Sequence, residues 1–122
     1  MFNMNRNRLH GNAVLPVTLR KPLPTADLEL LVRLAEDRES SATILGVLSS
    51  HFHERIRAAV ADNSCTPCMA LLRLARDKSV DIRYQLAENH NVPMQVLLIL
   101  VVDENPYVQV RAARTLERLQ TV

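Results

Sequence analysis

The stretch IRAAVADN at residues 56–63 recurs as IRYQLAEN at residues 82–89, with isoleucine, arginine, alanine, an acid and asparagine at matching positions. The second stretch begins 26 residues after the first. The same step towards the N-terminus reaches LLVRLAED at residues 30–37, which keeps the apolar frame, the alanine and the acid. A fixed period of this length is typical of proteins built from stacked structural repeats. The sequence therefore predicts a repeated unit over most of the chain.

A second half of the unit follows the same period. TPCMALLRLARD at residues 66–77 matches VPMQVLLILVVD at residues 92–103, and SATILGVLSSH at residues 41–51 lies one step earlier. The final copy, NPYVQVRAARTLERL at residues 105–119, fits if two residues are inserted after Val101. This insertion aligns Val110 and Arg111 with the Ile-Arg pairs of the earlier copies.

Each half-unit has the residue spacing of a short helix with one apolar face. Leu71, Leu74 and Ala75 fall at helical intervals, and Pro67 and Pro93 stand where a first helical turn tolerates a missing N–H. The expected helices are 26–37, 41–50, 54–62, 67–76, 80–88, 93–102 and 106–120. No segment alternates convincingly as a strand. A pair of short amphipathic helices cannot bury its own apolar face, so the pairs are expected to stack in an all-α fold.

The run from residue 59 to residue 93 resembles the leucine-rich repeat variant family. It shows an A-x-N…P turn, an LxxLAxD helix and a VR-like start of the next helix, and residues 103–119 resemble a terminal HEAT repeat. The resemblance implies a short right-handed α-solenoid of about four HEAT-like helix pairs, an armadillo-like architecture. Such repeats serve many different partners, so the resemblance implies macromolecular binding without naming the partner.

Basic charge is concentrated at the N-terminus. The chain has a net charge of +2, and four of its 15 Lys and Arg precede the first acidic residue, Asp27. The rest of the chain contains the other 11 Lys and Arg and all 13 Asp and Glu. Residues 1–24 are also rich in Asn and Pro without a helical period, which predicts a largely extended or disordered tail. We therefore expect a basic tail at 1–24 and a repeat domain at 25–122.

Composition narrows the possible functions. Apolar residues make up 48% of the chain, but no apolar run reaches the roughly 18 residues of a membrane span. The N-terminus has no apolar segment of the kind found in secretory signals, so a cytoplasmic protein is expected. Aromatic residues make up 3%, with no Trp, which weakens the case for base-stacking recognition of single-stranded nucleic acid.

Cys65 and Cys68 form a C-T-P-C sequence that has the outline of a redox motif. The βαβ context of a thioredoxin-like site is not visible, and the period matches Cys68 with Met94, a partly buried apolar position. Packing is therefore the favoured role. Redox activity and metal binding together with His90 stay open as alternatives, and no cofactor is expected.

Arginine recurs at one position of the unit, as Arg57, Arg83 and, with the inserted residues, Arg111. Such a row could bind phosphate, but Asp77 and Asp103 are placed to pair with it. Phosphate binding requires unpaired cations on a positive face, and the body of the chain is not positive. A structural ladder of ion pairs is the favoured interpretation.

Motifs of catalysis are missing from the sequence: it has no G-x-S-x-G, no HExxH and no phosphate-cradling glycine loop. We therefore expect a non-enzymatic scaffold that binds a protein partner on a concave surface lined by the second helix of each unit. Tyr84 is the expected anchor, because exposed aromatic residues dominate interface energetics. The other expected contacts are exposed positions of the same row: Arg55, Ala58, Asp81, Gln85, Gln109 and Arg114.

Three further expectations complete the sequence-based account. Nucleic-acid binding through the basic tail and the arginine row is the first alternative function, and thiol redox or metal sensing is the second. A homodimer formed through the N-terminal end is possible, because the first unit is less polar than the last. Gly46 falls in the middle of a helix, where close packing of a neighbouring helix would explain it.

Overall fold

The structure, a computed structural model, describes residues 24–120 and contains only helices in that range. The helices are α1 (Thr25–Glu36), α2 (Ala42–Leu48), α3 (Glu54–Asp62), α4 (Cys68–Leu74), α5 (Val80–Ala87), α6 (Met94–Leu100) and α7 (Pro106–Gln120). The all-α prediction is confirmed. The expectation of a disordered tail falls on residues 1–23, which lie outside the described part of the chain.

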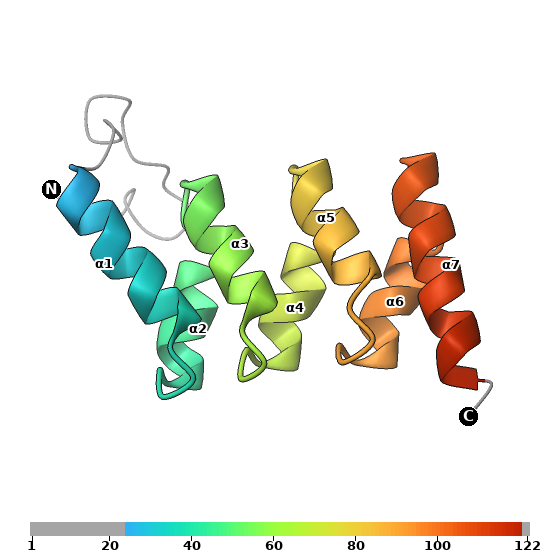
Figure 1. Cartoon of the computed structure of the whole chain (residues 1–122), viewed down its shortest axis with the longest axis horizontal. Helices are drawn as coiled ribbons and strands as arrows, with labels where there is room; N and C mark the ends of the chain where they lie inside the picture. The colour runs from blue at the N-terminus through green and yellow to red at the C-terminus, as the bar shows by residue number, and fades with distance from the viewer. Residues whose placement is uncertain (1–23, 121–122) are drawn as a thin grey trace, which may run out of the picture.

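The helices form two rows. Figure 1 shows α1, α3, α5 and α7 side by side in one row, with α2, α4 and α6 in a second row behind it. Each member of the first row packs on the next, and α2, α4 and α6 do the same. Within the described residues, no helix has both the length and the apolar content needed to cross a membrane.

From α2 to α7, helix starts keep the 26-residue interval without interruption. The helices α3, α5 and α7 begin at Glu54, Val80 and Pro106, and the helices α2, α4 and α6 begin at Ala42, Cys68 and Met94. The two-residue insertion expected after Val101 is therefore wrong. Burial gives the physical reason, since the fully covered core positions recur at the same interval as Ile56, Ile82 and Val108.

The core lies between the two rows and uses the same positions in each copy. The second row contributes two buried leucine series: Leu45, Leu71 and Leu97, and Leu48, Leu74 and Leu100. The first row contributes Val60, Leu86 and Ala112, all fully buried. Burial of one such leucine contributes about 1.5–3 kcal/mol, so these series hold the rows together.

Polar side chains cap the starts of α3, α5 and α7, whereas α1 begins after Pro24 without a side-chain cap. The Ser79 Oγ accepts a hydrogen bond from the Ile82 N–H at 3.4 Å, and Asn105 Oδ1 accepts one from the Val108 N–H at 3.2 Å. Thr66, which precedes Pro67, donates its hydroxyl to the Val60 carbonyl at 2.7 Å. Pro67 occupies the N-cap position of α4 and provides no side-chain cap.

Buried polar groups tie neighbouring helices of the first row. The Asn63 Nδ2 donates to the Ala35 carbonyl at 2.8 Å, and the Thr115 Oγ1 donates to the Ala87 carbonyl at 2.6 Å. Both bonds reach the end of the preceding first-row helix. Because a buried polar group without a partner is costly, these bonds favour a single register between neighbours.

Gly46 does not serve a close helix contact. A Cβ built at this position would meet no heavy atom within 4 Å beyond its local neighbours. The expectation of tight packing is therefore wrong, because the neighbouring helix leaves open space beside this residue.

Candidate functional site

Two buried arginines are paired with aspartates of the following turn. Arg57 donates from Nε to Asp77 Oδ2 at 2.8 Å and from Nη2 to Oδ1 at 3.1 Å. Arg83 makes the same bidentate pair with Asp103, at 2.8 and 3.3 Å. Bidentate charge-assisted bonds of this kind are strong and fix geometry.

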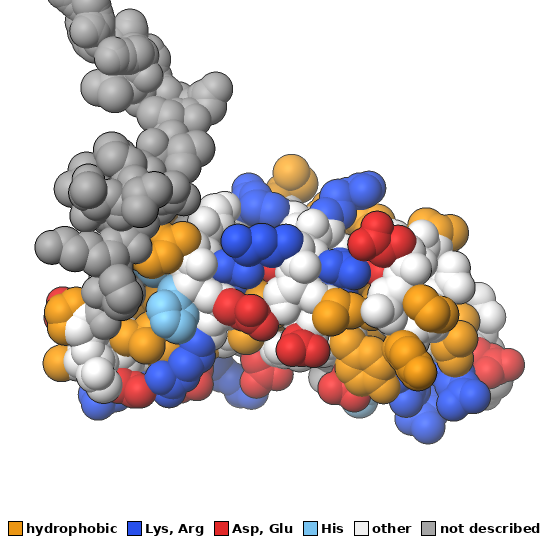
Figure 2. Space-filling view, turned by 90° about the horizontal axis from the view of Figure 1, so that it is seen from above, with side chains coloured by type: hydrophobic (Ala, Val, Ile, Leu, Met, Phe, Trp, Pro, Cys, Tyr) orange, Lys and Arg blue, Asp and Glu red, His pale blue; other side chains and the backbone are white. Residues whose placement is uncertain are grey.

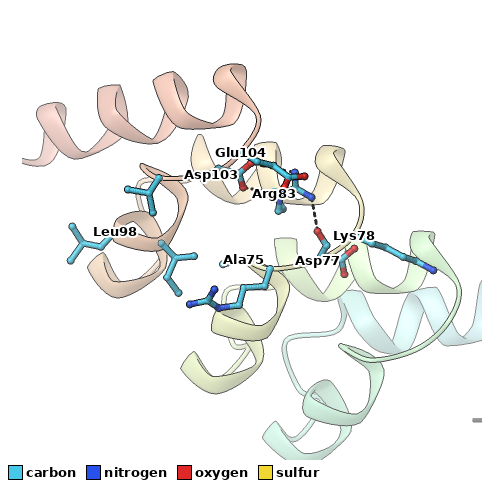
Figure 3. Close-up of a pocket in the computed structure, with 10 residues that line it drawn as sticks. Ala75, Asp77, Lys78, Arg83, Leu98, Asp103 and Glu104 are labelled. Atoms are coloured by element: carbon cyan, nitrogen blue, oxygen red, sulfur yellow. Dashed lines mark hydrogen bonds and ion pairs between the residues drawn. The ribbon is translucent and has the colours of Figure 1, made fainter.

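The same guanidinium groups also hold the preceding turn. Arg57 Nη1 donates to the carbonyls of His51 and Phe52 at 2.9 and 3.1 Å. Arg83 Nη1 donates to the Asp77 carbonyl at 2.6 Å, and Figure 3 shows this bond beside the Arg83–Asp103 pair. Each arginine therefore connects two successive turns, and most of its N–H donors are already engaged.

Both aspartates stay ionised because their partners outweigh their burial. Burial opposes ionisation of Asp77, yet hydrogen bonds from Arg57 and from the Ser79 N–H lower its pKa below the usual value. Asp103 behaves alike, with Arg83 and the Asn105 N–H overcoming its burial and lowering its pKa. The bond to Asp103 in turn raises the pKa of Arg83.

A large hollow of about 790 Å³ surrounds the second of these pairs (Figure 3). Its lining includes Arg76, Lys78, Asp103 and Glu104, so charges of both signs face it. The Arg83–Asp103 pair in its wall is engaged in holding the turns. This hollow therefore presents mixed charge and little that would select one ligand.

Arg111 does not belong to the arginine row. Because Val108 takes the buried position of Ile82, Gln109 falls at the position of Arg83, and Arg111 falls at the position of Gln85. No carboxylate of the described residues pairs with Arg111, and its Nε is buried without a hydrogen-bond partner there. The expectation that Arg111 belongs to the ladder of ion pairs is therefore wrong.

Arg111 instead lines a hollow of about 500 Å³ between α5 and α7. Its walls are mainly apolar and aromatic, with two arginines: Tyr84, Pro106, Tyr107, Val110, Arg111 and Arg114. Figure 2 shows hydrophobic side chains gathered at this C-terminal end of the molecule, beside basic ones. Of the hollows described here, this one combines the residue types that interfaces favour.

Large side chains around this hollow are exposed to solvent. Tyr107 is 77% exposed, Val110 is 49% exposed and Tyr84 is 38% exposed. Scattered exposed apolar residues need no explanation, but several around one hollow mark a binding surface. We call these three residues with Pro106, Arg111 and Arg114 the α5/α7 hollow.

The expected contact residues divide between this hollow and other places. Tyr84 and Arg114 both line the α5/α7 hollow. Arg55 lies elsewhere and forms an exposed bidentate pair with Glu29, at 2.7 and 3.2 Å. The hydrogen bond from Arg55 lowers the pKa of Glu29, and the same bond raises the pKa of Arg55.

Of the remaining expected contacts, Gln85 has a structural partner. Its Nε2 donates to the Ala58 carbonyl at 3.0 Å, which ties α5 to α3, and Ala58 itself is only partly exposed. Asp81 and Gln109 are exposed but do not line the α5/α7 hollow. The structure therefore does not gather the seven expected contacts into one patch.

The cysteines lie at the surface. Cys65 and Cys68 are both free and exposed, so the expectation that Cys68 packs in a partly buried position is wrong. Cys68 is the first residue of α4, and it falls outside the buried face that Ala70, Leu71 and Leu74 form. Within the described residues, no three His, Cys, Asp or Glu side chains gather as metal ligands, so Cys65 and Cys68 do not form such a set with His90.

Sequence reasoning missed half of the α5/α7 hollow. Pro106, Tyr107 and Val110 were not expected to contribute, because the inserted residues shifted α7 out of register with α5. The 26-residue recurrence of apolar core positions is the signal that could have found them. It places Val108 in the core and leaves Tyr107 and Val110 exposed.

No protein-family model, no curated protein and no solved structure matches this chain. Tyr84, Tyr107 and Arg111 line the same hollow, which places exposed aromatic surface beside a guanidinium group.

Proposed function

We propose that this chain is a non-enzymatic binding module that presents its first helix row to a protein partner. In this proposal the chain is a short right-handed α-solenoid of about four HEAT-like helix pairs. The 26-residue spacing of helix starts from α2 to α7 supports that architecture, as does packing of each row helix on its neighbours.

The α5/α7 hollow carries the proposal of a protein partner. Tyr84 and Tyr107 offer aromatic surface, and Arg111 and Arg114 stand beside them. Tyr and Arg are enriched among the residues that dominate binding energy at protein interfaces. A partner side chain placed in the hollow would cover exposed apolar surface without breaking the buried Arg57–Asp77 and Arg83–Asp103 pairs.

Affinity capture from the cell that makes this protein tests the proposal. Wild-type full-length chain is compared with a Tyr84→Ala/Tyr107→Ala variant and with a Met69→Ala/Leu98→Ala control, which removes exposed apolar side chains from the second row. We expect a partner retained by the wild type and the control but reduced at least tenfold with the tyrosine variant. Thermal melts of all three proteins verify that they are folded.

Equal retention by the tyrosine variant would contradict the proposed surface. A Tyr107→Ala variant gives an independent reading, because this side chain is largely exposed and its loss has little effect on folding. Loss of the partner only with the second-row control would move the binding surface to α4 and α6.

Nucleic-acid binding is supported less well than protein binding. Arg57 and Arg83 are engaged with aspartates, so the arginine row does not offer free guanidinium groups to phosphate. The basic tail stays as the other part of that hypothesis, and residues 1–23 lie outside the described structure. Thiol redox chemistry at Cys65 and Cys68 and a homodimer also stay predictions.

A further inference from the structure

Arg111 differs from the two buried arginines of the first row. Arg57 and Arg83 each place Nε on one aspartate oxygen and Nη2 on the other. Arg111 lines the α5/α7 hollow, and no acceptor of the described residues engages its guanidinium group. Its Nε is covered, so an acceptor from a ligand would reach the guanidinium group through its terminal Nη atoms.

Charge in the α5/α7 hollow favours an anion. Arg111 and Arg114 both line it, and its lining contains no acidic side chain. Among the described residues the ion pairs are Arg55–Glu29, Arg57–Asp77 and Arg83–Asp103, so neither Arg111 nor Arg114 is neutralised by a carboxylate there. Two unpaired guanidinium groups in one hollow select a negatively charged group.

Apolar walls exclude a simple phosphate as the best occupant. Tyr84, Pro106, Tyr107 and Val110 form the rest of the lining, and they gain nothing from a fully hydrated anion. A volume of about 500 Å³ accommodates an apolar side chain together with a carboxylate. An acidic peptide segment supplies both groups at the spacing of adjacent residues.

We infer that the α5/α7 hollow binds an acidic peptide segment of the partner, with an Asp or Glu carboxylate on Arg111 and a neighbouring apolar side chain between Tyr84 and Tyr107. The carboxylate accepts from the terminal Nη groups of Arg111, a residue that lines the hollow. Arg114 strengthens attraction of the acidic segment from the rim. This inference rests on the proposed function as a protein-binding module.

A phage-displayed library of random eight-residue peptides, selected on the full-length chain, provides the test. We expect enriched peptides to carry Asp or Glu beside an aliphatic or aromatic residue. Replacement of that acid by its amide, and the variant Arg111→Gln, should each weaken binding at least tenfold. The two changes combined should weaken it little further, because both remove the same contact.

Matched variants separate geometry from charge. Arg111→Lys keeps the charge but loses the Nε and the planar fork, so we expect an affinity between those of the wild type and Arg111→Gln. Arg76→Gln removes an exposed charge outside the lining of the α5/α7 hollow and should leave peptide affinity within twofold. Circular dichroism of each variant verifies folding.

Several results would overturn this inference. They are enrichment of neutral or basic peptides, equal binding of acidic peptides to Arg111→Gln, or no enrichment at all. Binding of a 20-nucleotide oligo-dT that requires Arg111 would assign the hollow to phosphate instead. Sedimentation showing a dimer lost in Arg111→Gln would assign it to a second copy. Partner capture that still requires Tyr84 and Tyr107 would leave the proposed function standing in each case.

Discussion

At the scale of single residues, the Arg57–Asp77 pair shows how charge is used inside this fold. Its side chains are 7% and 8% exposed, and the pair joins α3 to the turn that precedes α5. Removal of one partner from such a pair costs about 3–5 kcal/mol, because the other charge is left buried and unpaired. These arginines and aspartates therefore hold neighbouring turns in register.

Acid should weaken the fold through Asp77 and Asp103. Both have a pKa below the ordinary value in the folded state, so as pH falls below about 5 the unfolded chain binds more protons than the folded one. Their contribution is therefore complete above about pH 5 and is lost as pH falls through the folded pKa. Urea denaturation followed by circular dichroism at several pH values measures the loss.

The variant Asp77→Asn isolates this effect. We expect it to unfold about 3 kcal/mol more easily than the wild type at pH 7, because Arg57 loses its charged partner. The difference should shrink as pH falls through the folded-state pKa of Asp77, because the wild-type carboxyl then becomes neutral as well. Asp81→Asn, an exposed carboxylate outside the two pairs, should follow the wild type. An offset for Asp77→Asn that stays constant with pH would contradict the account.

At the scale of elements, the sequence predicts the helices more reliably than the hollow between them. The repeat pattern predicts all seven helices of the described residues, and buried apolar positions recur at its 26-residue interval from α2 to α7. The spacing of Arg57 and Arg83 from their aspartates likewise follows from the period. Alignment of the final copy on the match of Arg111 with Arg83 displaces Val108 from the buried position that it occupies.

That error has a physical cause. A core position such as Val108 is fixed by packing on every side, whereas a surface arginine can recur by coincidence. The exposed sides of Tyr107 and Val110 become evident only after α7 is placed on α5. The exposure of Cys68 likewise depends on the face of α4 that it occupies, and the sequence alone does not resolve that face.

Gly46 provides the prediction that belongs to a single helix. It lies inside α2, where glycine is about 1 kcal/mol less favourable than alanine. A methyl group added at this position would meet no heavy atom within 4 Å beyond its local neighbours. Gly46→Ala should therefore raise the free energy of unfolding by about 0.4–1 kcal/mol. Urea titration measures the gain.

The reverse change on α7 is the matched control. Ala113 is exposed within that helix, and Ala113→Gly should lower the free energy of unfolding by about 1 kcal/mol. A Gly46→Ala protein less stable than the wild type would show that α2 packs more closely than the structure describes.

At the scale of the whole molecule, each helix of a row packs on its neighbours, and the stacked helices present an extended surface. First-row helices contact their neighbours in sequence, and the buried pairs and carbonyl bonds connect successive turns. Such stacks build extended binding surfaces. The α5/α7 hollow lies at one end of this row, where exposed tyrosines and unpaired arginines meet.

Site-specific photocrosslinking tests the central claim, a protein partner on the α5/α7 hollow, most directly. A benzophenone side chain replaces Tyr107 in the full-length chain, and a second protein carries it in place of Met69, a residue of similar exposure on α4. After irradiation in the cell that makes this protein, we predict a covalent adduct of defined mass from position 107 and none from position 69. No adduct at position 107, or the same adduct from both positions, would contradict the account.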